Sequence, residues 1–235
     1  MSFLYTLLGQ LLGFIYGFIG NYAFSIVLFT LFVKLLLFPL NAAQIKSSRE
    51  MQAVQPKLKA IQEKYKNDKE MLNTKTLELY KDHKVNPLAG CLPIFIQMPI
   101  IFALFGTLKE PAKYVILHGA PLSNEALTQG FLWVKDLALP DTIGLIFPSA
   151  PSFMLGLPGF MPIVAAVLTY FQMTSMYKGQ EVNEQMKMMN NIFPVMILFM
   201  SQNLSAGLMV YWVISTLFSI GQQMVFSAMP KGDTK

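Results

Sequence analysis

The sequence predicts an all-α membrane protein with five transmembrane helices, and three observations carry that prediction. Hydrophobic residues make up 54% of the 235 residues and charged residues only 13%, about half the charged share of a soluble domain. The hydrophobic residues stand in continuous runs, whereas the strands of a membrane barrel would show alternation. Fourteen of the 18 basic residues fall in segments that five spans would leave on one side of the membrane. That side is predicted to be the cytoplasm.

The first two apolar runs cannot form one straight helix. Residues 1–40 hold a single charge, and a helix of that length would be roughly 60 Å long, twice the thickness of the hydrocarbon core. We therefore expect a bend near Gly20–Asn21 and a first span over residues 21–40. Ser2–Ile19 either spans the membrane too or lies along its surface. Three glycines at four-residue spacing suit either a close helix contact or a merely flexible apolar helix: Gly9, Gly13 and Gly17.

Residues 41–86 are the long polar segment of the chain, and their ten basic residues favour a cytoplasmic location. A row of apolar residues at three- and four-residue spacing predicts a first helix: Met51, Val54, Leu58, Ile61 and Tyr65. Asn67 and Asp68 then provide a turn and an N-cap for a second helix. The pattern predicts a cytoplasmic helical hairpin, with a solvated connector as the alternative.

Four further spans follow from the remaining apolar runs, and they put the N-terminus outside and the C-terminus in the cytoplasm. The predicted order is a second span kinked by its prolines (87–108), an extracellular segment (109–156), a third span (157–177), a cytoplasmic loop (178–188), a fourth span (189–203), a fifth span (205–227) and a cytoplasmic tail (228–235).

Lys34 carries the strongest functional implication, because it interrupts an otherwise uncharged apolar run. A charge at the bilayer centre costs roughly 2.5–3.5 kcal/mol on insertion scales. Such a lysine either extends to the membrane surface or faces a water-filled cavity. Thr30 lies one helical turn before it, on the same face.

Polar side chains also recur at helical spacing in other predicted spans. Gln97 lies in the middle of the second span, and Thr169 and Gln172 are neighbours on the third. The fifth span carries a polar stripe: Trp212, Ser215, Thr216, Ser219, Gln222 and Gln223. We interpret these faces as one hydrophilic groove, although hydrogen bonds between neighbouring helices would explain them too. The predicted groove residues are Lys34, Thr30, Gln97, Gln172, Trp212, Ser215 and Ser219.

Several function classes are not supported by the sequence. Cys91 is the single cysteine, so it excludes an internal disulfide and a cysteine-based metal site. His83 and His118 are far apart, and no motif of nucleotide binding, zinc proteolysis or serine hydrolysis occurs. We expect no enzyme, no cofactor, no metal and no direct contact with nucleic acid. The N-terminus has no lysine or arginine before its apolar run, so we expect no secretory signal peptide.

Five stretches of the chain together resemble the YidC/Oxa/Alb family of membrane protein insertases. They are FTLFVKLLLFPLNAAQ (Phe29–Gln44), MQAVQPKLKAIQEKY (Met51–Tyr65), VNPLAGCLPIFIQMPI (Val85–Ile100), FLWVKDLALPD (Phe131–Asp141) and GLMVYWVISTLFSIGQQ (Gly207–Gln223). They occur in order over nearly the whole chain. The pattern is most similar to bacterial members with five spans, which have a basic residue, usually arginine, at the position of Lys34.

The resemblance implies an insertase and membrane chaperone of the bacterial plasma membrane. Its expected partners are nascent membrane proteins and the lipid bilayer, with the Sec translocon and the ribosome as further candidates. Residues 1–20 would be an amphipathic helix on the outer face. A secondary transporter that uses Lys34 for an anion or a proton, or a structural scaffold, are the alternatives. The residues of the hairpin expected to meet a client are Met51, Gln55, Pro56, Leu58 and Tyr65.

Overall fold

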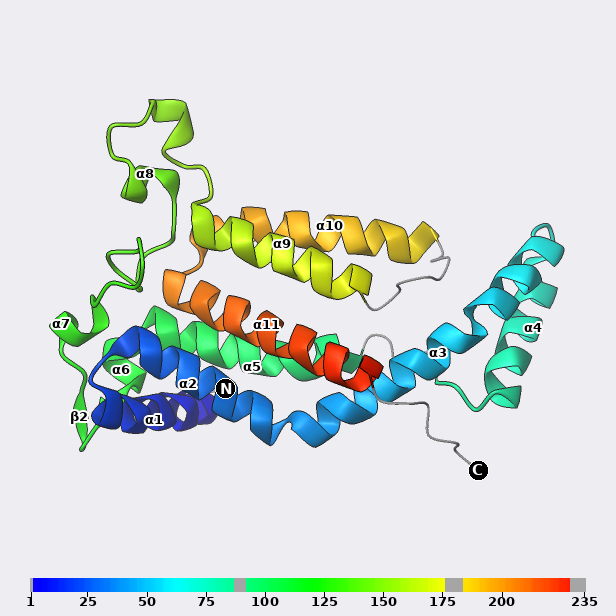
Figure 1. Ribbon diagram of the computed structural model, residues 1–235, viewed down its shortest axis with the longest axis horizontal. Helices are drawn as coiled ribbons and strands as arrows, with labels where there is room; N and C mark the ends of the chain where they lie inside the picture. The colour runs from blue at the N-terminus through cyan, green and yellow to red at the C-terminus, as the bar shows by residue number, and fades with distance from the viewer. Residues whose placement is uncertain (1, 87–91, 176–183, 229–235) are drawn as a thin grey trace.

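The computed structural model describes residues 2–86, 92–175 and 184–228, and it is mostly helical (Figure 1). The long helices of the bundle are α2 (Tyr22–Leu36), α5 (Leu92–Lys109), α9 (Phe160–Ser175), α10 (Glu184–Met200) and α11 (Ala206–Ala228). Helix α11 packs against α2, α5 and α9, and α10 packs against α9. We call the end that carries residues 110–159 the loop end, and the end that carries α3 and α4 the hairpin end.

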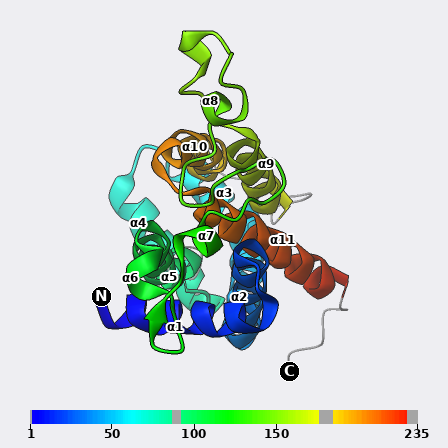
Figure 2. The same ribbon diagram turned by 90° about the vertical axis from the view of Figure 1, so that its left-hand side faces the viewer.

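The chain bends at Gly20–Asn21, as the sequence predicts. Helix α1 (Ser2–Ile19) ends there because Gly20 adopts a positive φ of 68°, which glycine tolerates without strain. The side chain of Asn21 then caps α2 by accepting a hydrogen bond from the amide of Phe24. Helix α1 lies across the loop end of the bundle and packs on α2 and α5 (Figure 2).

The glycine series of α1 is a close-contact face. A Cβ added at Gly9 or Gly13 would overlap the backbone carbonyl of Tyr114 or Ile116, and one at Gly17 would lie 2.8 Å from a methyl carbon of Leu117. We call residues 110–159 the loop segment. The partner of α1 is therefore the start of the loop segment rather than another long helix. Of the two interpretations of this spacing, the contact face is the correct one.

A second bend separates the bundle from the hairpin. Helix α3 (Phe38–Lys64) follows α2 after Leu37 at an angle of 63°. Pro39 explains the position, since a proline in the first turn of a new helix needs no backbone donor. The helix of the predicted first span thus ends at Leu36, before residue 40. Residues 38–40 belong to α3.

Helices α3 and α4 (Lys69–Asp82) pack against each other as a hairpin. The carboxylate of Asp68 caps α4 by accepting from the amide of Met71, so the predicted turn and N-cap are confirmed. At the other end of α4, His83 Nδ1 lies 3.1 Å from the carbonyl of Leu79, and His83 Nε2 lies 2.8 Å from Lys57 Nζ. If Nδ1 donates to this carbonyl, Nε2 is free to accept from the lysine, which connects α4 back to α3.

The loop segment holds short elements that the prediction of an all-α fold left out. Strands β1 (Ile116–Leu117) and β2 (Ala120–Pro121) pair antiparallel across a turn in which His118 and Gly119 both have positive φ. This two-residue turn has the backbone pattern that favours a tight β-hairpin. The short helices of the segment are α6 (Pro111–Tyr114), α7 (Asn124–Leu127), α8 (Ile143–Ile146) and η2 (Ser152–Met154).

Helix α10 begins earlier than the predicted fourth span. Residues 184–188 were expected in a loop because they are polar, but they form the first turn and a half of α10. Polarity argues against a lipid environment, not against a helix. The helix ends at Met200, and a short 3₁₀ turn, η3 (Ser201–Asn203), leads into α11. Pro99 lies inside α5, whereas Pro87 falls outside the described residues.

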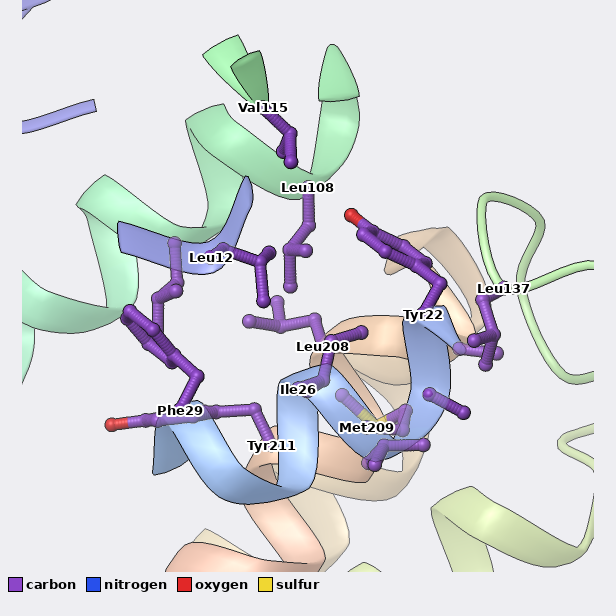
Figure 3. Packing of buried hydrophobic residues seen from close by; sticks show 14 of the residues in the cluster. Leu12, Tyr22, Ile26, Phe29, Leu108, Val115, Leu137, Leu208, Met209 and Tyr211 are labelled. Atoms are coloured by element: carbon purple, nitrogen blue, oxygen red, sulfur yellow. The ribbon is translucent and has the colours of Figure 1, made fainter. Parts of the chain in front are cut away.

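The apolar core gathers at the loop end of the bundle (Figure 3). Side chains from α1, α2, α5 and α11 converge there, and Phe29, Leu104 and Tyr211 are almost completely buried. The core continues into the loop segment through Val115 and Leu137. The loop end is therefore closed by packed hydrocarbon.

By length and composition, one helix of the described residues, Ala206–Phe226, can cross a membrane alone. The bent pair formed by α2 and α3 passes the same test when taken together. Shorter apolar helices are Phe3–Ile19, Gln97–Leu108 and Phe160–Ser175.

Replacing Gly13 by alanine tests the close approach of α1 to the loop segment. The added methyl would overlap the carbonyl of Ile116, so we expect the free energy of unfolding to fall by about 1–3 kcal/mol. Gly221→Ala is the control, because nothing lies within 4 Å of its Cβ position and alanine there should stabilise α11 by up to about 1 kcal/mol. Thermal unfolding in detergent measures both, and an unchanged Tm for Gly13→Ala would contradict the contact.

Candidate functional site

The side chain of Lys34 lies inside the protein, in the last turn of α2. It is only 7% exposed, and its Nζ donates a hydrogen bond to Ser219 Oγ of α11 at 3.1 Å. The Ser219 hydroxyl in turn donates to the carbonyl of Ser215 at 2.9 Å. The structure therefore brings together three of the predicted groove residues from two helices.

The charge of Lys34 has no counter-ion among the described residues. Two ion pairs, Lys75 with Glu78 and Lys113 with Glu110, join exposed side chains outside α2. A lysine ammonium has three N–H donors, and one of them has a described protein acceptor. A buried charge left in this state is costly unless another polar group or water approaches it.

Other predicted groove residues connect α11 to its neighbours. Gln97 of α5 donates to the hydroxyl of Tyr211, and the indole of Trp212 donates to Thr169 Oγ1 of α9 at 3.1 Å. Gln97 and Trp212 thus form hydrogen bonds between neighbouring helices. Nearer the hairpin end of the interface between α9 and α11, the Ser175 hydroxyl of α9 donates to Gln223 Oε1 of α11 at 3.1 Å.

The polar stripe of α11 therefore divides between two sides. Ser219 faces α2, whereas Trp212 faces α9. Thr30 is completely buried, and its hydroxyl donates to the carbonyl of Ile26 in its own helix. Thr30 does not line an accessible surface in this structure. Gln172 lies half-buried on α9.

Three of the five residues predicted to contact a client are buried. They are Met51, Gln55 and Leu58. Met51 belongs to an apolar cluster with Val54 and Val85, against which Tyr80 of α4 packs. Burial of Tyr80 raises the pKa of its phenol. Of the other two predicted residues, Pro56 is exposed and Tyr65 is half-exposed.

Two polar residues near the predicted groove, Tyr211 and Gln44, were not among those predicted from the sequence. Tyr211, the partner of Gln97, lies one helical turn before Ser215, so its position on the stripe was a usable signal. Gln44 of α3 is buried, and its amide nitrogen has no hydrogen-bond partner in the described part of the chain. The same holds for the amide nitrogen of Gln222. Gln44 gave no signal, because it is one of many polar residues in residues 41–86.

At the loop end, the segment Phe131–Asp141 accepts hydrogen bonds from the first turns of α9 and α11. The carbonyls of Leu137 and Leu139 accept the first amides of α11, from Gly207 and Ala206. The buried carboxylate of Asp141 accepts from the amide of Met161 at 2.7 Å and from the Trp133 indole at 3.2 Å. One segment thus caps both α9 and α11.

Comparison with known proteins decides the family. The profile of the family described as 60Kd inner membrane protein matches residues 14–233. A relative from Fusobacterium nucleatum, named membrane protein insertase YidC, is 39% identical over 239 residues, which is 99% of this chain and 100% of the relative. The chain belongs to the 60Kd inner membrane protein family.

Other members of the family are longer than this chain. A membrane protein insertase YidC from Chlorobium limicola is 40% identical over 217 residues, and the chain spans 35% of its length. A solved structure, described as an active YidC insertase with the first transmembrane domain resolved, is 26% identical with a TM-score of 0.66. The match covers 97% of this chain and 46% of that one, so the helical arrangement above is similar to the solved structure of the insertase.

Replacing Asp141 by alanine tests the closure of the loop end. The change leaves two buried donors without an acceptor, which costs about 1–3 kcal/mol each. We expect a lower Tm and faster proteolysis within residues 142–159. Asp136→Ala is the control, because that carboxylate caps only the exposed turn at Ala138, and its effect should stay within about 0.5 kcal/mol. Equal effects of the two substitutions would contradict the proposed role of Asp141.

Proposed function

We propose that this chain is a membrane protein insertase of the bacterial inner membrane, and that Lys34 is the group that receives the polar flank of a client. Family membership and the relatives named membrane protein insertase support the activity. The observation that carries the role of Lys34 is a buried ammonium with no counter-ion in the described part of the chain.

The proposed topology has α2, α5, α9, α10 and α11 as the five spans, with the loop end outside and the hairpin end in the cytoplasm. The distribution of basic residues supports this orientation, because ten of them lie in residues 41–86. Helix α1 then lies at the outer surface, and the C-terminus lies inside. The exposed row of α1 is mainly apolar, which suits contact with lipid: Phe3, Leu7, Phe14 and Phe18.

The short helix α2 supports a thinned bilayer beside the site. It has 15 residues, so at about 1.5 Å per residue it is shorter than the roughly 30 Å hydrocarbon core. Lipid adapts to short helices by local thinning. A thinner hydrocarbon layer lowers the cost of moving polar groups across it.

We propose a groove that is open toward the cytoplasm and closed outside. The buried apolar cluster at the loop end supports the closed side. Polar side chains on the other half support the open side. Lys34 and Ser219 lie toward the hairpin end, as do Gln44 and Gln222, whose amide nitrogens have no partner among the described residues. Water reaching this half would hydrate the ammonium, as a buried charge requires.

In the proposed mechanism, the hairpin meets the client, and the polar or acidic flank enters the groove beside Lys34. The ammonium has donors beyond the one given to Ser219, so it can bind a carboxylate or a carbonyl transiently. The apolar segment of the client moves into lipid between the spans, driven by hydrophobic transfer. For an acidic flank the membrane potential adds about 2.3 kcal/mol per charge per 100 mV. No covalent bond forms or breaks.

Replacement of Lys34 separates charge from packing. In proteoliposomes, insertion of a single-span client with an acidic flank should fall about tenfold or more for Lys34→Ala, since an unassisted charge costs roughly 2.5–3.5 kcal/mol at the bilayer centre and 1.4 kcal/mol is tenfold in rate. Lys34→Arg should retain most activity, because it keeps the charge. Protection of the translocated flank from protease measures the rate.

Lys46→Ala is the matched control, because Lys46 is an exposed lysine of the hairpin. Full insertion by Lys34→Ala would refute the role of the charge. Uptake of a small anion into the vesicles, lost in Lys34→Ala, would favour the transporter instead.

Replacing Ser219 by leucine tests whether the polar surface beside Lys34 is used. The change removes the described acceptor of the ammonium and places hydrocarbon beside it, so insertion should fall several-fold. Thr174→Leu is the control, because the Thr174 hydroxyl bonds only to carbonyls of its own helix. Both variants should keep a similar Tm. Unchanged insertion by Ser219→Leu would support a scaffold in which the polar side chains serve packing alone.

A further inference from the structure

Part of the loop segment has the surface of a membrane-contacting element. From Thr142 to Tyr177 the chain has no aspartate, glutamate, lysine or arginine. Within residues 142–159, large apolar side chains are exposed rather than buried: Leu145, Phe147, Phe153 and Leu157. Phe153 is 78% exposed. We call residues 142–159 the apolar lobe.

The apolar lobe is folded on itself rather than extended. The amides of Ile143 and Gly144 donate to the carbonyls of Leu157 and Leu155, each at 3.0 Å. A Cβ at Gly144 would lie 2.7 Å from the Leu155 carbonyl oxygen, so the two sides of the lobe are in close contact. At its base, Asp141 connects the lobe to the first turn of α9. The exposed rings are therefore presented by an ordered loop.

The position of the apolar lobe indicates what covers it. In both views the lobe extends sideways from the loop end, beyond α9 and α10, whereas α1 lies on the opposite side of the bundle (Figures 1 and 2). Its apolar surface continues onto α9 through the exposed Phe160, Ile163 and Val167. In the proposed topology, which this inference rests on, that side of α9 faces lipid. The lobe is thus an extension of a lipid-facing surface at the level of the outer membrane boundary.

We propose that the apolar lobe inserts into the outer leaflet of the bilayer, where it binds the boundary between headgroups and acyl chains. Aromatic and aliphatic side chains on an uncharged loop suit that region, and the serines and prolines between them suit its polar side. With α1, the lobe gives the bundle two lateral contacts with the outer leaflet, on opposite sides. Two such contacts restrict the tilt of the bundle relative to the membrane. Residues 142–156 of the lobe belong to the predicted extracellular segment, and residues 157–159 to the start of the predicted third span.

Spin labels on single cysteines test the proposal in the full chain. After Cys91→Ser, a nitroxide is attached at Phe153→Cys or Leu145→Cys, and the protein is reconstituted at low density in vesicles of phosphatidylethanolamine and phosphatidylglycerol. Collision with oxygen, which dissolves in lipid, is compared with collision with a water-soluble nickel complex. We expect both lobe labels to collide several-fold more with oxygen than with nickel.

Two reference labels separate this proposal from the proposed topology. Val167→Cys on α9 should be accessible to oxygen, and Glu125→Cys on α7 should be accessible to nickel. If Val167 itself is in water, the topology fails. If Val167 is in lipid while Phe153 and Leu145 match Glu125, the lobe lies in water and the proposal is wrong. Lobe labels shielded from both reagents would show that protein covers the lobe, which would also overturn it.

Discussion

An ammonium group inside an apolar bundle is the constraint on which the rest of this structure depends. Lys34 is almost fully buried, and Ser219 is its described hydrogen-bond partner. Without a carboxylate beside it, this charge is tolerable only where water or a polar client group can approach. In the proposed groove, water and the client reach this group from the hairpin end, and the loop end is sealed so that no continuous polar path crosses the membrane.

The two ends of the bundle differ in the chemistry of their buried side chains. At the loop end, Phe29, Leu104 and Tyr211 belong to the main apolar core, and the segment before α9 supplies the acceptors for the first amides of α9 and α11. Toward the hairpin end of α2 and α11, buried polar side chains occur as well, among them Lys34, Thr216 and Gln222. The same helix, α11, serves both ends, since its apolar first turns enter the core and its later turns carry Ser219 and Gln222.

Rigidity at the loop end comes from close backbone packing as well as from side chains. The glycines of α1 let it lie directly on the backbone of residues 114–116, so the helix is fixed across the end of the bundle. The hairpin, by contrast, packs mainly on itself and joins the bundle through the bend at Leu37.

The sequence by itself determined the helical class, the bend at Gly20–Asn21, the Asp68 cap and the place of Lys34 in an apolar helix. These depend on composition, on local backbone preferences and on the cost of a charge in an apolar run, all of which act within one segment. Tertiary structure decided which polar residues meet. Ser215, Ser219 and Trp212 share one stripe, yet Ser219 binds Lys34 and Trp212 binds Thr169, because the position of a neighbouring helix is not encoded in the period of the stripe. Tertiary structure also decided that Met51, Leu58 and Thr30 are buried, and the Thr30 hydroxyl bonds to a carbonyl of its own helix. Whether an apolar or hydroxyl side chain is exposed depends on what packs over it.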